Sequence, residues 1–64
     1  MNRYSLIFWQ DAIPAGWLSR LKKDSVRIED NAPHIGLLTI QCTEVNASEY
    51  RKSPQVMRCV RLPD

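Results

Sequence analysis

The first segment of the chain carries apolar side chains on both faces of an extended backbone. Within residues 3–9, one face of an extended backbone would carry Tyr4, Leu6 and Phe8. The other face would carry Ser5, Ile7 and Trp9. Aromatic and β-branched residues favour a pleated backbone, and a strand that is apolar on both faces normally lies inside a sheet. The pattern therefore predicts a central strand with apolar side chains on both faces, and it leaves open which of the two sets faces a helix.

The next segment has apolar residues at helical spacing. Pro14, Trp17, Leu18 and Leu21 recur at intervals of three and four, which places them on one stripe of a helix. Proline suits the first helical turn, because its missing N–H would be unpaired there. We therefore predict a helix from Pro14 to about Lys23, with Trp17, Leu18 and Leu21 in the core.

Two further strands are indicated by alternation. Residues 25–29 place Val26 and Ile28 on one face, and residues 35–45 alternate in the same way. A turn-forming stretch, residues 30–34, separates them. The two segments therefore read as an antiparallel hairpin, in which the second strand is the longest of the chain and directs Leu38, Ile40 and Cys42 to the core.

The last part of the chain predicts a short helix and a final strand. Asn46 and Glu49 have the spacing of a capping box, so one or two helical turns are expected to run to about residue 52. Residues 55–62 then form a strand. Its two faces are expected to hold Val56, Val60 and Leu62 on one side and Met57 and Cys59 on the other.

The order of elements predicts a single α+β domain over residues 1–64. Strand, helix, strand, strand, short helix and strand follow one another, which is a reduced form of the ferredoxin-like order. We expect one small sheet of three or four mostly antiparallel strands, with one helix packed across it and the other face largely open. The alternatives are a βααβ-type unit, or a βαββ unit with a loosely appended C-terminal strand.

Composition excludes disordered and membrane-spanning classes of protein. The chain has 64 residues, of which 44% are hydrophobic and 25% are charged, so it holds one modest core and is not disordered. The longest uninterrupted apolar run has four residues, too few to span a bilayer or to form the core of a signal peptide. We therefore expect a cytoplasmic protein that does not bind membranes.

No arrangement of residues predicts catalysis, a metal or a cofactor. Cys42, Cys59 and His34 are the only soft ligands in the chain, fewer than a structural zinc site requires. The two cysteines fit small buried hydrophobes of a reducing compartment. The chain has no glycine-rich phosphate loop and no hydrolase or metalloprotease motif. We therefore expect no enzyme activity and no bound cofactor.

Charge is uneven along the chain. The net charge is +2, yet residues 1–49 sum to −1 and residues 50–63 to +4. The basic side chains of this last stretch are Arg51, Lys52, Arg58 and Arg61. They suit contacts with phosphates without sequence preference, but charged side chains also protect exposed strand edges from pairing. Nucleic-acid binding through residues 51–61 is therefore an alternative function, and a solvated edge is the simpler explanation.

The leading hypothesis is a protein-binding surface. If Ile7 and Trp9 face away from the helix, they form an apolar anchor of the kind that dominates interfaces, with Arg58 and Arg61 supplying charged contacts. Alternatively, the two faces are reversed or the chain termini cover Trp9. A homodimer that pairs two such faces is a third outcome. In size and lack of motifs, the chain resembles accessory and inhibitor proteins carried by phages and other mobile elements.

Overall fold

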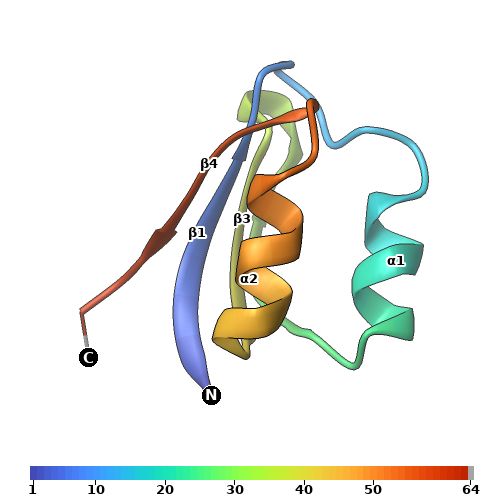
Figure 1. Cartoon of the computed structure of the whole chain (residues 1–64). Helices are drawn as coiled ribbons and strands as arrows, with labels where there is room; N and C mark the ends of the chain where they lie inside the picture. The colour runs from blue at the N-terminus through green and yellow to red at the C-terminus, as the bar shows by residue number, and fades with distance from the viewer. Residues whose placement is uncertain (64) are drawn as a thin grey trace.

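A four-stranded sheet carries two helices on one of its faces in the computed structural model, which describes residues 1–63 (Figure 1). The elements are β1 (Asn2–Phe8), α1 (Trp17–Lys23), β2 (Arg27–Ala32), a 3-10 turn η1 (Pro33–Ile35), β3 (Leu37–Cys42), α2 (Glu44–Arg51) and β4 (Val56–Arg61). The strand order is β2-β3-β1-β4, and every neighbouring pair is antiparallel. The predicted α+β class is confirmed, with β1 and β3 at the centre of the sheet.

The parity of β1 separates a helix face from an open face. Tyr4, Leu6 and Phe8 are buried beneath the helices, which decides between the two face assignments that the sequence pattern leaves open. Ile7 points to the open face and is half-buried between its neighbours in the register, Leu37 of β3 and Arg58 of β4.

An aromatic cluster joins the helices to the sheet. The Trp17 ring of α1 meets Phe8 of β1 edge to face at 5.0 Å and Tyr50 of α2 at 5.6 Å. The indole N–H of Trp17 donates to Gln55 Oε1 at 2.8 Å, and the Tyr50 hydroxyl donates to Asp24 Oδ2 at 2.7 Å. Because both polar atoms have partners, the two large rings are buried without loss of a hydrogen bond.

The first helix is shorter than its sequence pattern predicts. Gly16 has a φ of +88°, a left-handed conformation that is incompatible with the helix interior, so α1 begins at Trp17 and not at Pro14. With only seven residues, α1 buries the narrow stripe of Trp17 and Leu21. The prediction that Leu18 belongs to the core is wrong, because it lies beside this stripe and is 44% exposed.

The second helix begins earlier than predicted. Thr43 is its N-cap, and its Oγ1 accepts a hydrogen bond from the backbone N–H of Asn46 at 3.2 Å. This cap ends β3 at Cys42, so β3 has six residues and the longest strand is β1 with seven. The strand before β3 also differs from the prediction. β2 extends through Ala32, into the stretch expected to be a turn, and η1 makes the turn to β3.

A register shift changes the faces of β4. Phe8 pairs with Val56 and Ile7 pairs with Arg58, so Met57 is an extra residue in the strand. Such a bulge inverts the alternation beyond it. Val56 and Cys59 are therefore buried together, and the prediction that Val60 shares the face of Val56 is wrong, because Val60 is 45% exposed.

Two helices, and not the single one predicted, cover the helix face (Figure 1). α2 lies alongside β1 and β4, while α1 lies further from β4. No helix formed by residues 1–63 is long and apolar enough to cross a membrane.

Candidate interaction surface

The open face of the sheet changes from polar to apolar along the strands. At one end, Arg3 of β1 pairs with Gln41 of β3, and its guanidinium forms a salt bridge with Glu29 at 3.1 Å. At the other end, Ile7 lies between Leu37 and Arg58. The apolar end is therefore next to the start of β4 and to the loop that follows β1.

Trp9 lies at this apolar end and is 67% exposed. It follows β1 directly, and its backbone N–H donates to the carbonyl of Gln55 at 3.1 Å, which places it beside the start of β4. Met57 and Val60 of β4 are also exposed, at 41% and 45%. We call Ile7, Trp9, Met57, Arg58 and Val60 the open-face patch.

Gly36 holds the loop that carries Trp9. The Phe8 backbone N–H donates to the Gly36 carbonyl at 2.8 Å, and a Cβ placed on Gly36 would lie 2.1 Å from the carbonyl oxygen of Gln10. The same Cβ would lie 3.2 Å from the carbonyl oxygen of Ala12. The backbone after Trp9 therefore packs directly against a residue that has no side chain, and a side chain at position 36 would displace this loop.

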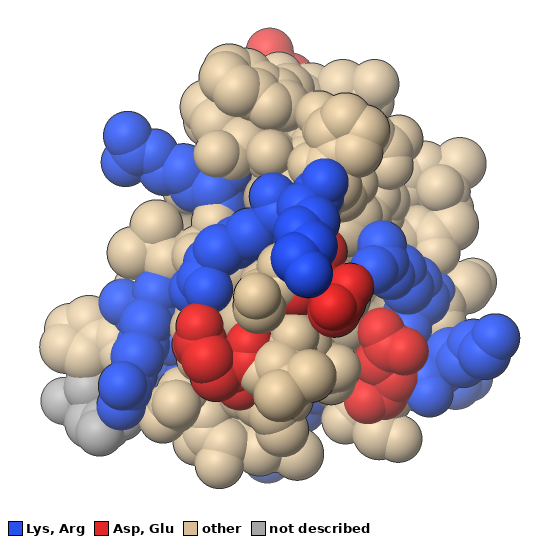
Figure 2. Space-filling model, in the orientation of Figure 1, with Lys and Arg blue, Asp and Glu red and all other residues tan. Residues whose placement is uncertain are grey.

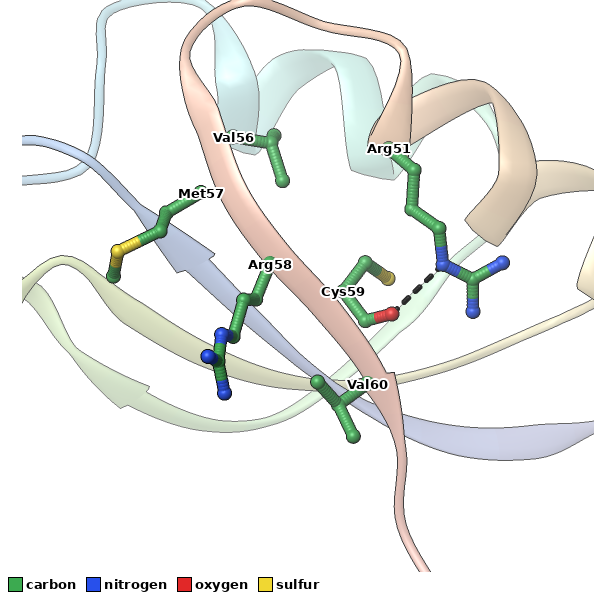
Figure 3. Close-up of a pocket in the computed structure, with 6 residues that line it drawn as sticks. All are labelled: Arg51, Val56, Met57, Arg58, Cys59 and Val60. Atoms are coloured by element: carbon green, nitrogen blue, oxygen red, sulfur yellow. Dashed lines mark hydrogen bonds between the residues drawn. The ribbon is translucent and has the colours of Figure 1, made fainter.

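A hollow of about 390 Å³ runs along β4 (Figure 3). Its lining consists of one α2 residue and five consecutive β4 residues, namely Arg51, Val56, Met57, Arg58, Cys59 and Val60. Met57, Arg58 and Val60 point to one side of the strand, and Cys59 and Arg51 lie on the other (Figure 3). Because both sides of β4 contribute, the hollow follows the strand edge that does not pair with β1. We call it the edge groove.

Arg51 closes one end of a polar network beside this groove. Its Nε donates to the carbonyl oxygen of Cys59 at 2.8 Å, and its Nη1 donates to Glu44 Oε1 at 2.8 Å. The Tyr4 hydroxyl donates to the other oxygen of Glu44. The network therefore links the core strand β1, both ends of α2 and the edge of β4.

Hydrogen bonding sets the protonation of this network. The pKa of Glu44 is lowered, first by the hydrogen bond from Tyr4 and then by that from Arg51. The pKa of Tyr4 is raised, mainly because its hydroxyl donates to Glu44. Glu44 is thus ionised and Tyr4 neutral around neutral pH, so the network holds the end of α2 against β4.

The predicted basic residues lie in different places. Lys52 forms an exposed salt bridge with Glu49 at 3.5 Å, and Arg61 Nη2 donates to Asn2 Oδ1 at 3.3 Å. Arg61 is opposite Tyr4 in the register and so belongs to the helix side, whereas Arg58 is opposite Ile7 on the open face. Of the predicted binding residues, Ile7 and Arg58 are therefore neighbours on the open face, the backbone of Trp9 lies beside the start of β4, and Arg61 is on the opposite side of the strand.

The charged surface is basic along β4. Figure 2 shows Lys and Arg side chains on the left of the molecule, over this strand, others on the right, on the side of α1, and Asp and Glu side chains between the two groups. Among residues 1–63 the salt-bridged cations are Arg3, Arg51 and Lys52, so Arg58 has no carboxylate partner in this part of the chain.

The cysteines have the environment of core residues. Cys42 and Cys59 are free and buried. Burial raises the pKa of Cys59 to about 11 and also raises that of Cys42, which keeps both thiols protonated and weakly nucleophilic. In the part of the chain that the structure describes, no three His, Cys, Asp or Glu side chains are grouped so that they could hold a metal ion.

Sequence reasoning misses the edge groove and its network. Glu44 and Arg51 are seven residues apart, two turns of a helix, which is the signal that could have paired them. The signal is lost when Glu44 is assigned to a strand and the helix is started at Asn46. The edge groove depends in addition on the bulge at Met57, which no local pattern indicates.

Comparison with models of protein families finds no match for this chain, and searches of curated proteins and of solved structures find none either.

Proposed function

We propose that this chain is a small, non-catalytic binding protein, of the accessory or inhibitor type, that occupies a surface of a larger protein through the open-face patch. The observation that carries the proposal is the indole of Trp9, which is 67% exposed although the chain is small and its other indole is buried. Exposing a tryptophan forgoes the free energy of burying it, roughly 2 kcal/mol or more. A partner surface that covers Trp9 would recover this free energy.

The composition of the patch supports a protein partner. Tryptophan, methionine and arginine are enriched at the centres of interfaces, and the patch combines Trp9, Met57 and Arg58. Because Ile7 is already half-buried, it would contribute less contact area to the partner than Trp9 does. A cytoplasmic setting belongs to the same proposal, since both cysteines are free thiols.

Nucleic-acid binding through residues 51–61 is the second proposal, favoured by the run of positive charge over residues 50–63. It receives less support from the geometry. Arg51 and Lys52 already pair with acids, and Arg58 and Arg61 lie on opposite sides of β4. A shared phosphate track would need these cations on one face.

Capture of partners from the host lysate, with and without nuclease, tests the proposal. A tagged chain is expected to recover one protein in stoichiometric amount, and nuclease is expected to leave the yield unchanged. Recovery that disappears after nuclease treatment and falls steeply with salt would contradict the protein-binding function and favour the phosphate contacts. Recovery of the chain alone, as a dimer, would place a second copy on the patch instead.

A further inference from the structure

We propose that the free edge of β4 binds an extended, acidic segment of the partner protein as a fifth strand of the sheet. The inference rests on the proposed function and deepens it, because it names the kind of segment that the partner offers. It arises from three features of one strand, namely the backbone groups on its outer edge, the adjacent edge groove and its charge.

The backbone of β4 offers hydrogen bonds on its outer side. The N–H of Leu62 donates to Arg3 of β1, so Leu62 and, by alternation, Val60 direct their backbone groups inward. Cys59 and Arg61 then direct theirs outward, and the bond from Arg51 Nε to the Cys59 carbonyl agrees with this direction. The Cys59 carbonyl therefore already accepts one hydrogen bond, whereas within residues 1–63 the N–H groups of Cys59 and Arg61 and the Arg61 carbonyl have no partner on this side.

The opposite edge of the sheet is less suited to pairing. In β2 the register shifts between Ile28 and Asp30, in the middle of the strand, and the exposed residues include both signs of charge. Bulges and mixed charges protect edges from other strands. In β4 the shift lies at its start, so the stretch from Arg58 to Arg61 is regular. The groove of about 390 Å³ lies beside this stretch and leaves room for another chain.

The charge of the edge selects an acidic segment. Arg58 projects to the open face and Arg61 to the helix side, and residues 50–63 contain no acid. A second copy paired through the same edge would bring the arginines of both copies together, and like charges across strands are unfavourable. Because side chains alternate between the two faces of a strand, acidic side chains on the helix side of an added strand would instead pair with Arg61, while apolar side chains on its open face would cover Val60.

Synthetic peptides test the inference on the intact chain. The probe is a peptide of alternating glutamate and valine, compared with the same peptide carrying N-methyl groups on alternate residues and with a lysine–valine peptide. The glutamate–valine peptide is expected to bind and to slow amide hydrogen exchange at Cys59 and Arg61. N-methylation is expected to weaken binding roughly tenfold, because main-chain hydrogen bonds are lost. The lysine peptide is expected not to bind.

Variants of the chain separate the edge from the patch. Arg61→Glu, which lies outside the open-face patch, is expected to weaken binding of the glutamate–valine peptide roughly tenfold. Val45→Ala, at an exposed position of α2, is the control and is expected to leave this binding unchanged. N-methylated peptide that binds as well as the parent peptide would overturn the inference, as would tighter binding of a single-stranded oligonucleotide. If Arg61→Glu captures the lysate partner normally while Trp9→Ala does not, the edge inference fails and the proposed function stands.

Discussion

The two tryptophans of this small chain have opposite environments. Trp17 is buried between Phe8 and Tyr50, with Arg20 stacked 4.7 Å from its ring centre. Trp9 is largely exposed, and its recorded hydrogen bond is made by its backbone. The sequence does not show which tryptophan is buried, because each of them stands in a segment rich in apolar residues.

Stability measurements on the two tryptophans are expected to differ. Trp17→Ala should lower the free energy of unfolding by about 3–5 kcal/mol, because it removes a packed ring and leaves a cavity. Trp9→Ala should change it by about 0.5 kcal/mol or less, as for an exposed site. Urea unfolding followed by circular dichroism checks both values. A comparable loss in the two variants would show that Trp9 is a core residue.

Glu44 should make stability depend on pH in the acid range. Its pKa is lower in the folded chain than its ordinary value of 4.5, so its contribution is present above that value and is lost as the pH falls through the folded pKa. Glu44→Gln should therefore flatten part of the acid decline in the free energy of unfolding. Glu49→Gln, which removes only an exposed salt bridge, is the matched control and should leave the decline intact. Equal declines in wild type and Glu44→Gln would contradict the role of the network.

At the scale of elements, periodicity indicates each helix and strand but not where it ends. The alternation in β1 and β3 agrees with the burial of their side chains, because these two strands keep one register with each other. The ends of the helices are set by Gly16 and Thr43, through a positive φ and a side-chain cap. These are backbone conformations that depend on the packed structure, so apolar spacing does not predict them.

In the open-face patch, too, some features follow from the local sequence pattern and others depend on how the strands pair. The sequence pattern groups Ile7 with Trp9 but does not decide which face of the strand the helices cover, and the structure places Ile7 on the open face and leaves Trp9 exposed. Alternation already separates Arg58 from Arg61, which are three residues apart, but it does not predict which of them shares the open face with Ile7, because that depends on the pairing of β4 with β1. The bulge at Met57 decides that pairing.

The contact between Gly36 and the loop after β1 gives a prediction about elements. Gly36→Ala should lower the free energy of unfolding and move the Trp9 indole resonance, because the new Cβ would meet the Gln10 carbonyl. Gly16→Ala is the control, since Gly16 also has a positive φ but has no atom within 4 Å of the added Cβ. It should cost only the backbone strain, about 1–2 kcal/mol. Two-dimensional NMR and urea unfolding check the pair.

If Gly36→Ala leaves the Trp9 indole resonance in place, the loop is not positioned by this contact. If both glycine variants lose the same stability, the close approach of Gln10 adds nothing to the strain of the left-handed conformation.

At the scale of the whole molecule, the two faces of the sheet have separate roles. The helix face holds the core, with its tryptophan, tyrosines and free cysteines. Among residues 1–63, no helix covers the open face, which carries the exposed Trp9 at one end and Arg58 without a salt-bridge partner. In the proposed function, the helix face supplies the stability of the chain and the open face supplies its contacts with a partner.

The affinity of Trp9→Ala for the captured partner tests this account most directly. Wild type, Trp9→Ala and Val45→Ala are compared at equal folded fraction, since Val45 is an equally exposed apolar residue on α2, at 72% exposure. Trp9→Ala should bind at least about thirtyfold more weakly, as for a hot-spot residue, and Val45→Ala should match wild type. Equal affinity of all three proteins would contradict the assignment of Trp9 as the anchor.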